Sequence, residues 1–436
     1  IGGSIANSGS INTFEVSGTI ANGITNHSNI GSLIVNESVS YNGNGSDRIT
    51  QALEVAKDKT LTIQNSGSSN GTLYFNSTTN GTIDNAGTIL GSIDNVSNST
   101  LGTFINSGTI NGDINNEGTI TSIDNSGVIT GEIVSGSNGQ TSQIDKIINT
   151  GTIGTAKTKV ATFKTLVASN QDASSKFSDA ISLNTITTTE ISNGGLINGN
   201  IRVKGQSDIQ ELNNTDTIAG CIILEGGRIG NINNTNGAIA NCMSFSNGAS
   251  VDNLNNSGTI KDKITNDSGS ITIDNDGSGF IGGITTSNGG TTNISNGGFQ
   301  NPGGNIGLIT NDGSNSTTNI IEWNVGNPDN PKSPIKVAGD NLGGINTGTI
   351  YVDVTPGKVY DVEQIVTDGN GSGVDKNGNS LADQLNNGQG IFDSLHHASD
   401  IITIIDEGGG EFSAGLDTQE LSGKTLGASL IYSSRM

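Results

Sequence analysis

The segment Ile197-Asn-Gly-Asn-Ile201 returns as Ile218-Ala-Gly-Cys-Ile222, as Ile239-Ala-Asn-Cys-Met243 and as Ile260-Lys-Asp-Lys-Ile264. Each copy starts 21 residues after the one before it. A fixed period of this length predicts a solenoid, in which function usually resides on a long surface rather than in one pocket.

The same repeat occupies the first half of the chain. Its copies share an Ile-x-x-x-Ile pattern and start at Ile20, Ile89, Ile110 and Ile129. A second unit, Ile-Asx-Asn followed by a small residue and Gly, lies between the copies, as at Ile83-Asp-Asn85 and Ile123-Asp-Asn125. We therefore expect the repeat to continue over residues 1–325.

The repeat residues favour strands over helices. Ile, Val and Thr prefer strands, and the Asn-Gly and Asn-Ser-Gly pairs supply bends because Asn and Gly tolerate positive φ. The sequence thus predicts an all-β fold, a parallel β-solenoid with rungs of roughly 21 residues stacked about 4.8 Å apart. An Asn at the same corner of each rung would form a hydrogen-bonded ladder along the stack.

The chain is acidic, with a formal net charge of −22 from 41 acidic and 19 basic residues. This charge disfavours nucleic acid and anionic membranes as partners, and it keeps a long β surface soluble. No apolar run is long enough for a transmembrane helix.

The two cysteines, Cys221 and Cys242, occupy the same place in consecutive repeats. Stacking in register would bring their Cα atoms within disulfide range. A disulfide across the two rungs and a pair of stacked free thiols both remain open. Two cysteines without further ligands nearby do not indicate a metal site.

Two stretches interrupt the repeat, and we interpret them as insertions. Residues 46–59 carry Ala, Leu and Glu and predict a short helix. Residues 155–181 contain a cluster of basic and aromatic residues that is a candidate binding site because inserted loops often carry specificity. The cluster consists of Lys157, Lys159, Phe163, Lys164 and Lys176. The alternative is a flap whose apolar residues, at helical spacing, cover the solenoid.

Residues 326–436 depart from the repeat and predict a C-terminal capping region, since the end of a solenoid exposes unpaired strands. Residues 350–354 and 359–366 alternate in polarity around Thr355-Pro-Gly-Lys358, which predicts a hairpin. Residues 380–398 predict partly helical structure, and residues 401–405 and 426–432 predict strands.

The chain resembles the passenger domain of a type V autotransporter. The resemblance rests on the repeated architecture, on Asn377-Gly-Asn-Ser-Leu-Ala-Asp-Gln-Leu385 and on Leu421-Ser-Gly-Lys-Thr-Leu-Gly-Ala-Ser429. It implies a right-handed parallel β-helix with a C-terminal autochaperone region, joined in the full-length protein to an outer-membrane β-barrel. It also implies secretion across, or display on, the outer membrane of a Gram-negative bacterium. The repeat tracts are most similar to adhesin or vacuolating-toxin-like passengers.

Catalytic motifs are weak. Asn266-Asp-Ser-Gly-Ser270 differs by one residue from the serine-protease motif of some autotransporters, but it falls on an ordinary repeat bend, and the only upstream histidine is His27. Few arginines are available to line a polysaccharide-degrading groove. We therefore expect no enzyme activity and no cofactor.

One stretch has the spacing of a calcium loop. Asp375, Asn377, Asn379 and Asp383 place oxygen ligands at positions 1, 3, 5 and 9. Ser380 stands where calcium loops usually have Gly, and the Glu expected at position 12 is absent. Calcium is therefore only a weak candidate, and the expected metal content is none.

The sequence favours an adhesin that binds host-cell glycans or proteins, or other copies of itself, through polar columns along the solenoid. The alternative is a toxin-like passenger that oligomerises and acts on host membranes.

Overall fold

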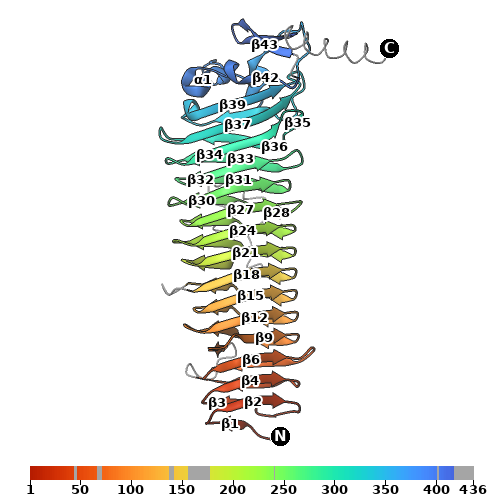
Figure 1. The fold of residues 1–436 in the computed structure, drawn as a ribbon, viewed down its shortest axis with the longest axis vertical. Coiled ribbons are helices and arrows are strands. Elements are labelled where there is room, and N and C mark those ends of the chain that lie inside the picture. Colours follow the sequence, from red (N-terminus) through yellow and green to blue (C-terminus); the bar gives the residue numbers. More distant parts are fainter. Residues whose placement is uncertain are drawn as a thin grey trace, which may run out of the picture. The chain divides into compact units, whose positions relative to one another are not determined.

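A computed structural model describes residues 1–43, 47–65, 71–136, 142–155, 177–239, 241–399 and 402–416. The chain is an all-β parallel solenoid of about 13 turns with rungs of roughly 21 residues, as predicted (Figure 1). It divides into two compact units, residues 1–252 and 253–436.

Residues 1–252 form three columns of parallel strands, each pairing with its counterpart one rung on. The first column contains β2 (Ile11–Val16), β4 (Ile30–Val35), β6 (Ile49–Val55), β9 (Gly81–Asn85), β12 (Thr100–Asn106), β15 (Thr119–Asn125), β18 (Gln143–Asn149), β21 (Thr187–Asn193), β24 (Asp208–Asn214) and β27 (Arg228–Asn234). The second contains β1 (Ile5–Asn7), β3 (Ile24–Asn26), β5 (Val39–Asn42), β7 (Thr60–Gln64), β10 (Thr88–Leu90), β13 (Thr109–Asn111), β16 (Val128–Ile129), β19 (Thr152–Ile153), β22 (Leu196–Ile197), β25 (Thr217–Ile218) and β28 (Ala238–Ile239). The third contains β8 (Thr72–Phe75), β11 (Ser92–Asn95), β14 (Ile114–Asn116), β17 (Ile133–Ser135), β20 (Asp179–Asn184), β23 (Asn200–Lys204), β26 (Ile222–Glu225) and β29 (Met243–Ser246).

The core of this unit is a set of stacked aliphatic side chains. Ile93 pairs in register with Ile114, which pairs with Ile133, and all three are almost fully buried. Because the same residue type lies at the same place in each rung, a narrow coil fills with β-branched side chains that strands accommodate well. A low apolar fraction of the sequence is therefore enough to fill the interior.

A buried asparagine ladder ends the strands of the first column from β9 to β27. From Asn85 through Asn106, Asn125 and Asn149 the side-chain Nδ2 of each residue donates to Oδ1 of the next at 2.7–2.8 Å, and the series continues through Asn193, Asn214 and Asn234. The predicted corner ladder is confirmed. It lets polar side chains occupy the interior, because almost every buried amide finds a partner.

The ladder has a direction, and its first member shows the consequence. Asn85 pairs in register with Val55, which cannot donate, so Asn85 Oδ1 is buried without a hydrogen-bond partner. The shorter ladder of the third column behaves in the same way. Asn95 donates to Asn116 at 2.8 Å, but it lies in register with Phe75 and its own Oδ1 has no partner.

Residues 253–436 continue the parallel pairing with longer strands. Strand β30 (Ser250–Asn256) contains the boundary between the units. One column contains β32 (Ser270–Asn275), β34 (Thr291–Gly298), β37 (Thr317–Gly326), β39 (Ile345–Val352) and β42 (Leu395–His397). The other contains β31 (Thr259–Asp267), β33 (Phe280–Ser287), β36 (Asn305–Asn311), β38 (Ile335–Ala338) and β41 (Val366–Thr367), and β35 (Asn301–Pro302) flanks β34. Parallel pairing is present beyond residue 325, in β38, β39, β41 and β42.

Non-repeating elements pack within this second unit. They are the short helices η2 (Leu342–Gly344), η3 (Val362–Gln364), α1 (Leu381–Gly388) and η4 (Phe392–Ser394), and an antiparallel sheet of β40 (Tyr360–Asp361), β44 (Glu411–Leu416) and β43 (Ile402–Gly408). The predicted helical structure within 380–398 and the strand at 401–405 are confirmed. The strand predicted at 426–432 lies outside the described residues.

Two local predictions are wrong. Residues 49–55 form strand β6, an ordinary rung in which Ile49, Leu53 and Val55 are buried, and not a helix. Stacking on β4 overrides the weak helix preference of Ala, Leu and Glu. The hairpin around Thr355–Lys358 is also absent: β39 pairs in parallel with β37 and β42, while β40 pairs with β44.

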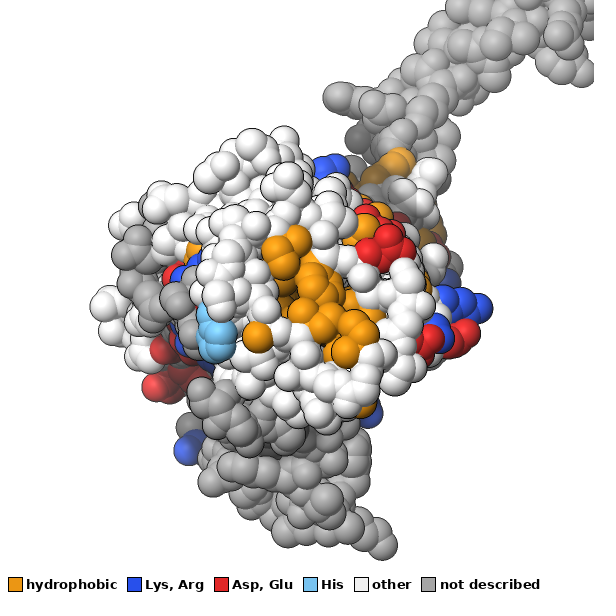
Figure 2. Space-filling model, turned by 90° about the horizontal axis from the view of Figure 1, so that it is seen from below, with side chains coloured by type: hydrophobic (Ala, Val, Ile, Leu, Met, Phe, Trp, Pro, Cys, Tyr) orange, Lys and Arg blue, Asp and Glu red, His pale blue; other side chains and the backbone are white. Residues whose placement is uncertain are grey.

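The N-terminal rung is less covered than those that follow. Ile5, Ile11 and Phe14 are partly exposed, and Ile1 is 70% exposed. Figure 2 shows apolar atoms gathered at the centre of this end. Interior side chains of later rungs such as Ile110 and Ile120 are fully buried because each rung covers the one before.

Candidate binding surface

The outward side chains of the first column form two rows from β9 to β15, one polar and one mixed. Thr82, Thr103 and Ser122 lie in register in one row. Beside it, Asp84, Ile105 and Asp124 form the second, in which the apolar Ile105 separates the two carboxylates. Side chains alternate between the two faces of a strand, so the inward Ile pattern places both rows outside. The surface therefore repeats hydroxyl groups at the rung spacing in this stretch.

In residues 253–436 an outward asparagine row takes the same role. Asn346 Nδ2 donates to Asn319 Oδ1 at 2.9 Å, and Asn319 Nδ2 donates to Asn293 Oδ1 at 2.8 Å. All three side chains are half-buried. Their mutual hydrogen bonds hold an array of amides at the surface in a fixed orientation.

A groove with a cavity volume of about 500 Å³ crosses the start of the third column. Tyr74, Asp94 and Asn115 form one row of its lining, since they lie in register on β8, β11 and β14. Asn76 and Glu117 belong to the neighbouring part of the lining. No sequence motif connects these residues, which come together only through the register of the rungs, so they were not among the predicted site residues.

Contacts within the groove fix several of its side chains. Arg48 lies with its guanidinium carbon 5.0 Å from the centre of the Tyr74 ring, a cation–π contact. Asn115 Nδ2 donates to Asp94 Oδ1 at 2.6 Å. Burial raises the pKa of the Asp94 carboxyl, opposed by the hydrogen bond from Asn115.

Farther along the third column, charges pair between rungs. Arg202 contacts Asp179 at 2.7 Å and Glu225 at 2.5 Å, and its side chain is largely buried. On the first column, Arg228 bridges Asp208 and Asp252 in the same way, at more exposed positions. Surface ion pairs stabilise little, so the pairs of Arg228 add little to the stability of the solenoid.

Glu132 lies beside this acidic region. Burial, together with the negative charges of Asp179 and Asp113, raises the pKa of its carboxyl to about 7, against the opposing effect of a hydrogen bond from Ser182. Because the folded-state pKa lies above the ordinary value of 4.5, the folded chain binds this proton more tightly than the unfolded chain. The associated stability is present below pH 4.5 and is lost as the pH rises through about 7.

We therefore expect Glu132→Gln to raise the urea midpoint at pH 8 and to leave it nearly unchanged at pH 4. The amide cannot ionise, so the variant avoids burying a charge at high pH. Urea unfolding followed by circular dichroism measures the effect, with Glu54→Gln, at an exposed position of β6, as the control. A midpoint difference that stays the same at both pH values would contradict this interpretation.

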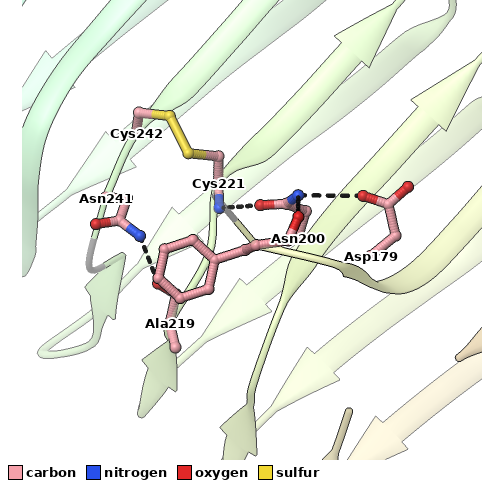
Figure 3. The surroundings of a disulfide bond; sticks show 7 residues. Asp179, Asn200, Ala219, Cys221, Asn241 and Cys242 are labelled. Atoms are coloured by element: carbon pink, nitrogen blue, oxygen red, sulfur yellow. Dashed lines mark hydrogen bonds between the residues drawn. A yellow bond between two sulfur atoms is a disulfide. The ribbon is translucent and has the colours of Figure 1, made fainter. Parts of the chain in front are cut away.

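Cys221 and Cys242 form a disulfide between consecutive rungs, with the two Cα atoms 4.6 Å apart (Figure 3). The backbone N–H of Cys221 donates to Asn200 Oδ1 at 2.9 Å, and Asn200 Nδ2 donates to Asp179 Oδ1 at 3.1 Å. Of the two alternatives that the sequence left open, the structure contains the disulfide. The disulfide ties the rung of Cys221 to the rung of Cys242. The Asn200 side chain in turn connects the Cys221 backbone to Asp179 of β20.

The calcium candidates lie in an exposed loop that its own hydrogen bonds hold. Asp375 Oδ1 accepts from the backbone N–H groups of Asn377 and Asn379, and Oδ2 accepts from Asn379 Nδ2 and Gln384 Nε2. These bonds to the carboxylate lower the pKa of Asp375. Asp383 is not among its partners, and calcium binding here stays a weak prediction.

The other candidates fall in two groups. Lys157, Lys159, Phe163, Lys164 and Lys176 lie outside the described residues, whereas the last residues of the same predicted insertion, 179–181, belong to rung strand β20. Asn266 of the protease-like motif is a buried side chain that donates to Thr291 O at 2.9 Å and Thr292 Oγ1 at 3.0 Å. The bend at Ser268 has a φ of 69°, so the motif has a structural role there.

In the described part of the chain, no cluster of three or more His, Cys, Asp or Glu side chains has the arrangement of a metal site. None of the described helices is long and apolar enough to cross a membrane. Comparison with protein-family models, with curated proteins and with solved structures finds no match.

Proposed function

We propose that the chain is the passenger region of a type V autotransporter, displayed on or released from a Gram-negative cell surface, and that it acts as an adhesin. One observation carries the proposal. The outward side chains repeat rung after rung as polar rows, as in Thr82, Thr103 and Ser122 or in Asn293, Asn319 and Asn346.

Such rows are better suited to binding a surface than to catalysis. Hydroxyl and amide groups at a fixed pitch of about 4.8 Å form many similar weak contacts, and multivalent display on a cell converts them into firm attachment. Catalysis instead needs a few convergent groups with distinct roles. The partners we propose are host-cell glycans or proteins and other copies of the chain.

Display of the chain on a non-adherent bacterial strain tests this function. We expect the displaying cells to attach to host epithelial cells and to clump. Clumping should increase with ionic strength, because salt screens the repulsion between chains of net charge −22. A strain that displays the same amount of a plain, non-adhesive solenoid is the control. Attachment and clumping no greater than in this control would overturn the proposal.

A further inference from the structure

The groove at the start of the third column presents polar groups that the protein itself leaves unused. Among the described residues, no hydrogen bond reaches the Tyr74 hydroxyl, the Asn76 side-chain amide or Asp94 Oδ2. Asp94 Oδ2 is not fully buried, so it faces the groove or solvent. The groove thus offers a hydroxyl, an amide with both donor and acceptor atoms, and a strong acceptor.

The way these groups are held makes them suitable for a ligand. Arg48 packs over the Tyr74 ring, and Asn115 fixes Asp94 through its other oxygen at 2.6 Å. The Tyr74 and Asp94 side chains are half-buried, and the two residues lie in register on paired strands. A ligand that binds here therefore meets side chains that are already ordered, which lowers the entropic cost of binding.

The lining also excludes several ligand classes. Asp94 and Glu117 repel anionic ligands such as sulfated or sialylated chains, and one arginine does not reverse this. Most of the lining is polar, which disfavours an apolar ligand. A ligand rich in hydroxyl groups, uncharged and with one apolar face, matches acceptors and donors beside a single aromatic ring.

We propose that this groove binds neutral glycans, with Asp94 and Asn76 hydrogen-bonded to sugar hydroxyls and Tyr74 packed against the sugar ring. The proposal rests on the adhesin function and names the class of receptor. The rows of polar residues then supply further weak contacts along the surface, while the groove provides selectivity.

The test measures binding of the purified 436-residue chain to immobilised oligosaccharides. Neutral chains of galactose, glucose or N-acetylglucosamine are compared with sialylated and sulfated chains. We expect binding to at least one neutral chain and at least about tenfold weaker binding by Asp94→Asn, the loss typical of a contact with a charged group. Tyr74→Ala should also bind about tenfold more weakly, because it removes the aromatic packing surface. Asp353→Asn, which changes an exposed carboxylate that belongs neither to the groove nor to the polar rows, is the matched control and should bind like the wild type.

Thermal unfolding of each variant shows whether it folds, and Tyr74→Phe, which keeps the ring, provides a second variant. Binding only to charged chains, or unchanged binding by folded Asp94→Asn and Tyr74→Ala, overturns the proposal. The adhesin function is judged separately. If displaying cells attach but groove variants attach equally, only the groove proposal fails. If the purified chain binds neutral sugars but displaying cells do not attach, only the adhesin proposal fails.

Discussion

Replacing Trp323 with alanine is expected to destabilise residues 253–436 by about 3–5 kcal/mol, the usual cost of emptying a buried aromatic site. Trp323 is fully buried and lies in register between Asn296 and Ile350. Its Nε1–H donates to Ser333 O at 2.8 Å. Ser333 Oγ accepts from Asn296 Nδ2 at 2.9 Å. Asn296 ends a buried ladder in which Asn256 donates to Asn275 and Asn275 donates to Asn296, so the tryptophan also supports this ladder.

Chemical unfolding followed by far-ultraviolet circular dichroism measures this loss, because the variant lacks the chain's only tryptophan. Ile321→Ala is the control, since Ile321 lies on the same strand and is 51% exposed. We expect a loss below about 1 kcal/mol there, as is usual for surface positions. Equal losses in the two variants would show that Trp323 does not hold this part of the chain together.

The second large effect concerns the asparagine ladder. Asn125→Val should destabilise residues 1–252 by about 3 kcal/mol, because it breaks the ladder at two places. Asn106 Nδ2 loses its 2.7 Å bond to Asn125 Oδ1 and keeps only longer bonds to Gly108 O and Val128 O, and the buried Asn149 Oδ1 loses its donor. The new valine is apolar and of similar shape to asparagine. The loss of stability therefore comes from the hydrogen-bonding groups that lose their partners.

Asn85→Val is the matched control for this prediction. It removes an oxygen that already lacks a partner and leaves Asn106 Oδ1 without one instead, so the number of unpaired acceptors does not change. The new valine would also stack in register on Val55 of the preceding rung, so that two apolar side chains lie next to each other. We expect a loss of about 1 kcal/mol, the net value of one hydrogen bond. Comparable urea midpoints for the two variants would contradict the directional account of the ladder.

The sequence was sufficient to predict the solenoid because one residue type recurs at one period. The inward isoleucines and the corner asparagines each belong to the repeat, and Cys221 and Cys242 do so too. The prediction failed where a segment carries mixed preferences. Residues 49–55 read as helix by composition, but the covering rungs make them strand β6. Thr355-Pro-Gly-Lys358 has the composition of a hairpin turn, yet its flanking strands pair with distant partners.

The groove could not be predicted in this way. Tyr74 and Asp94 are 20 residues apart, and Asn115 follows 21 residues later, so no local pattern connects them. Their proximity depends on which residue of each rung pairs with which, and rung length varies along the chain. Register, which the structure provides, is therefore the information that turns an acidic, polar surface into a candidate site.

Competition by the soluble chain tests the central claim, that this surface attaches cells through a saturable receptor. Displaying cells are mixed with host cells in the presence of increasing amounts of the purified chain. The adhesin account predicts that attachment falls towards the level of cells without the chain as the receptor becomes occupied. Attachment that stays constant at all concentrations, with the soluble chain folded, would contradict it.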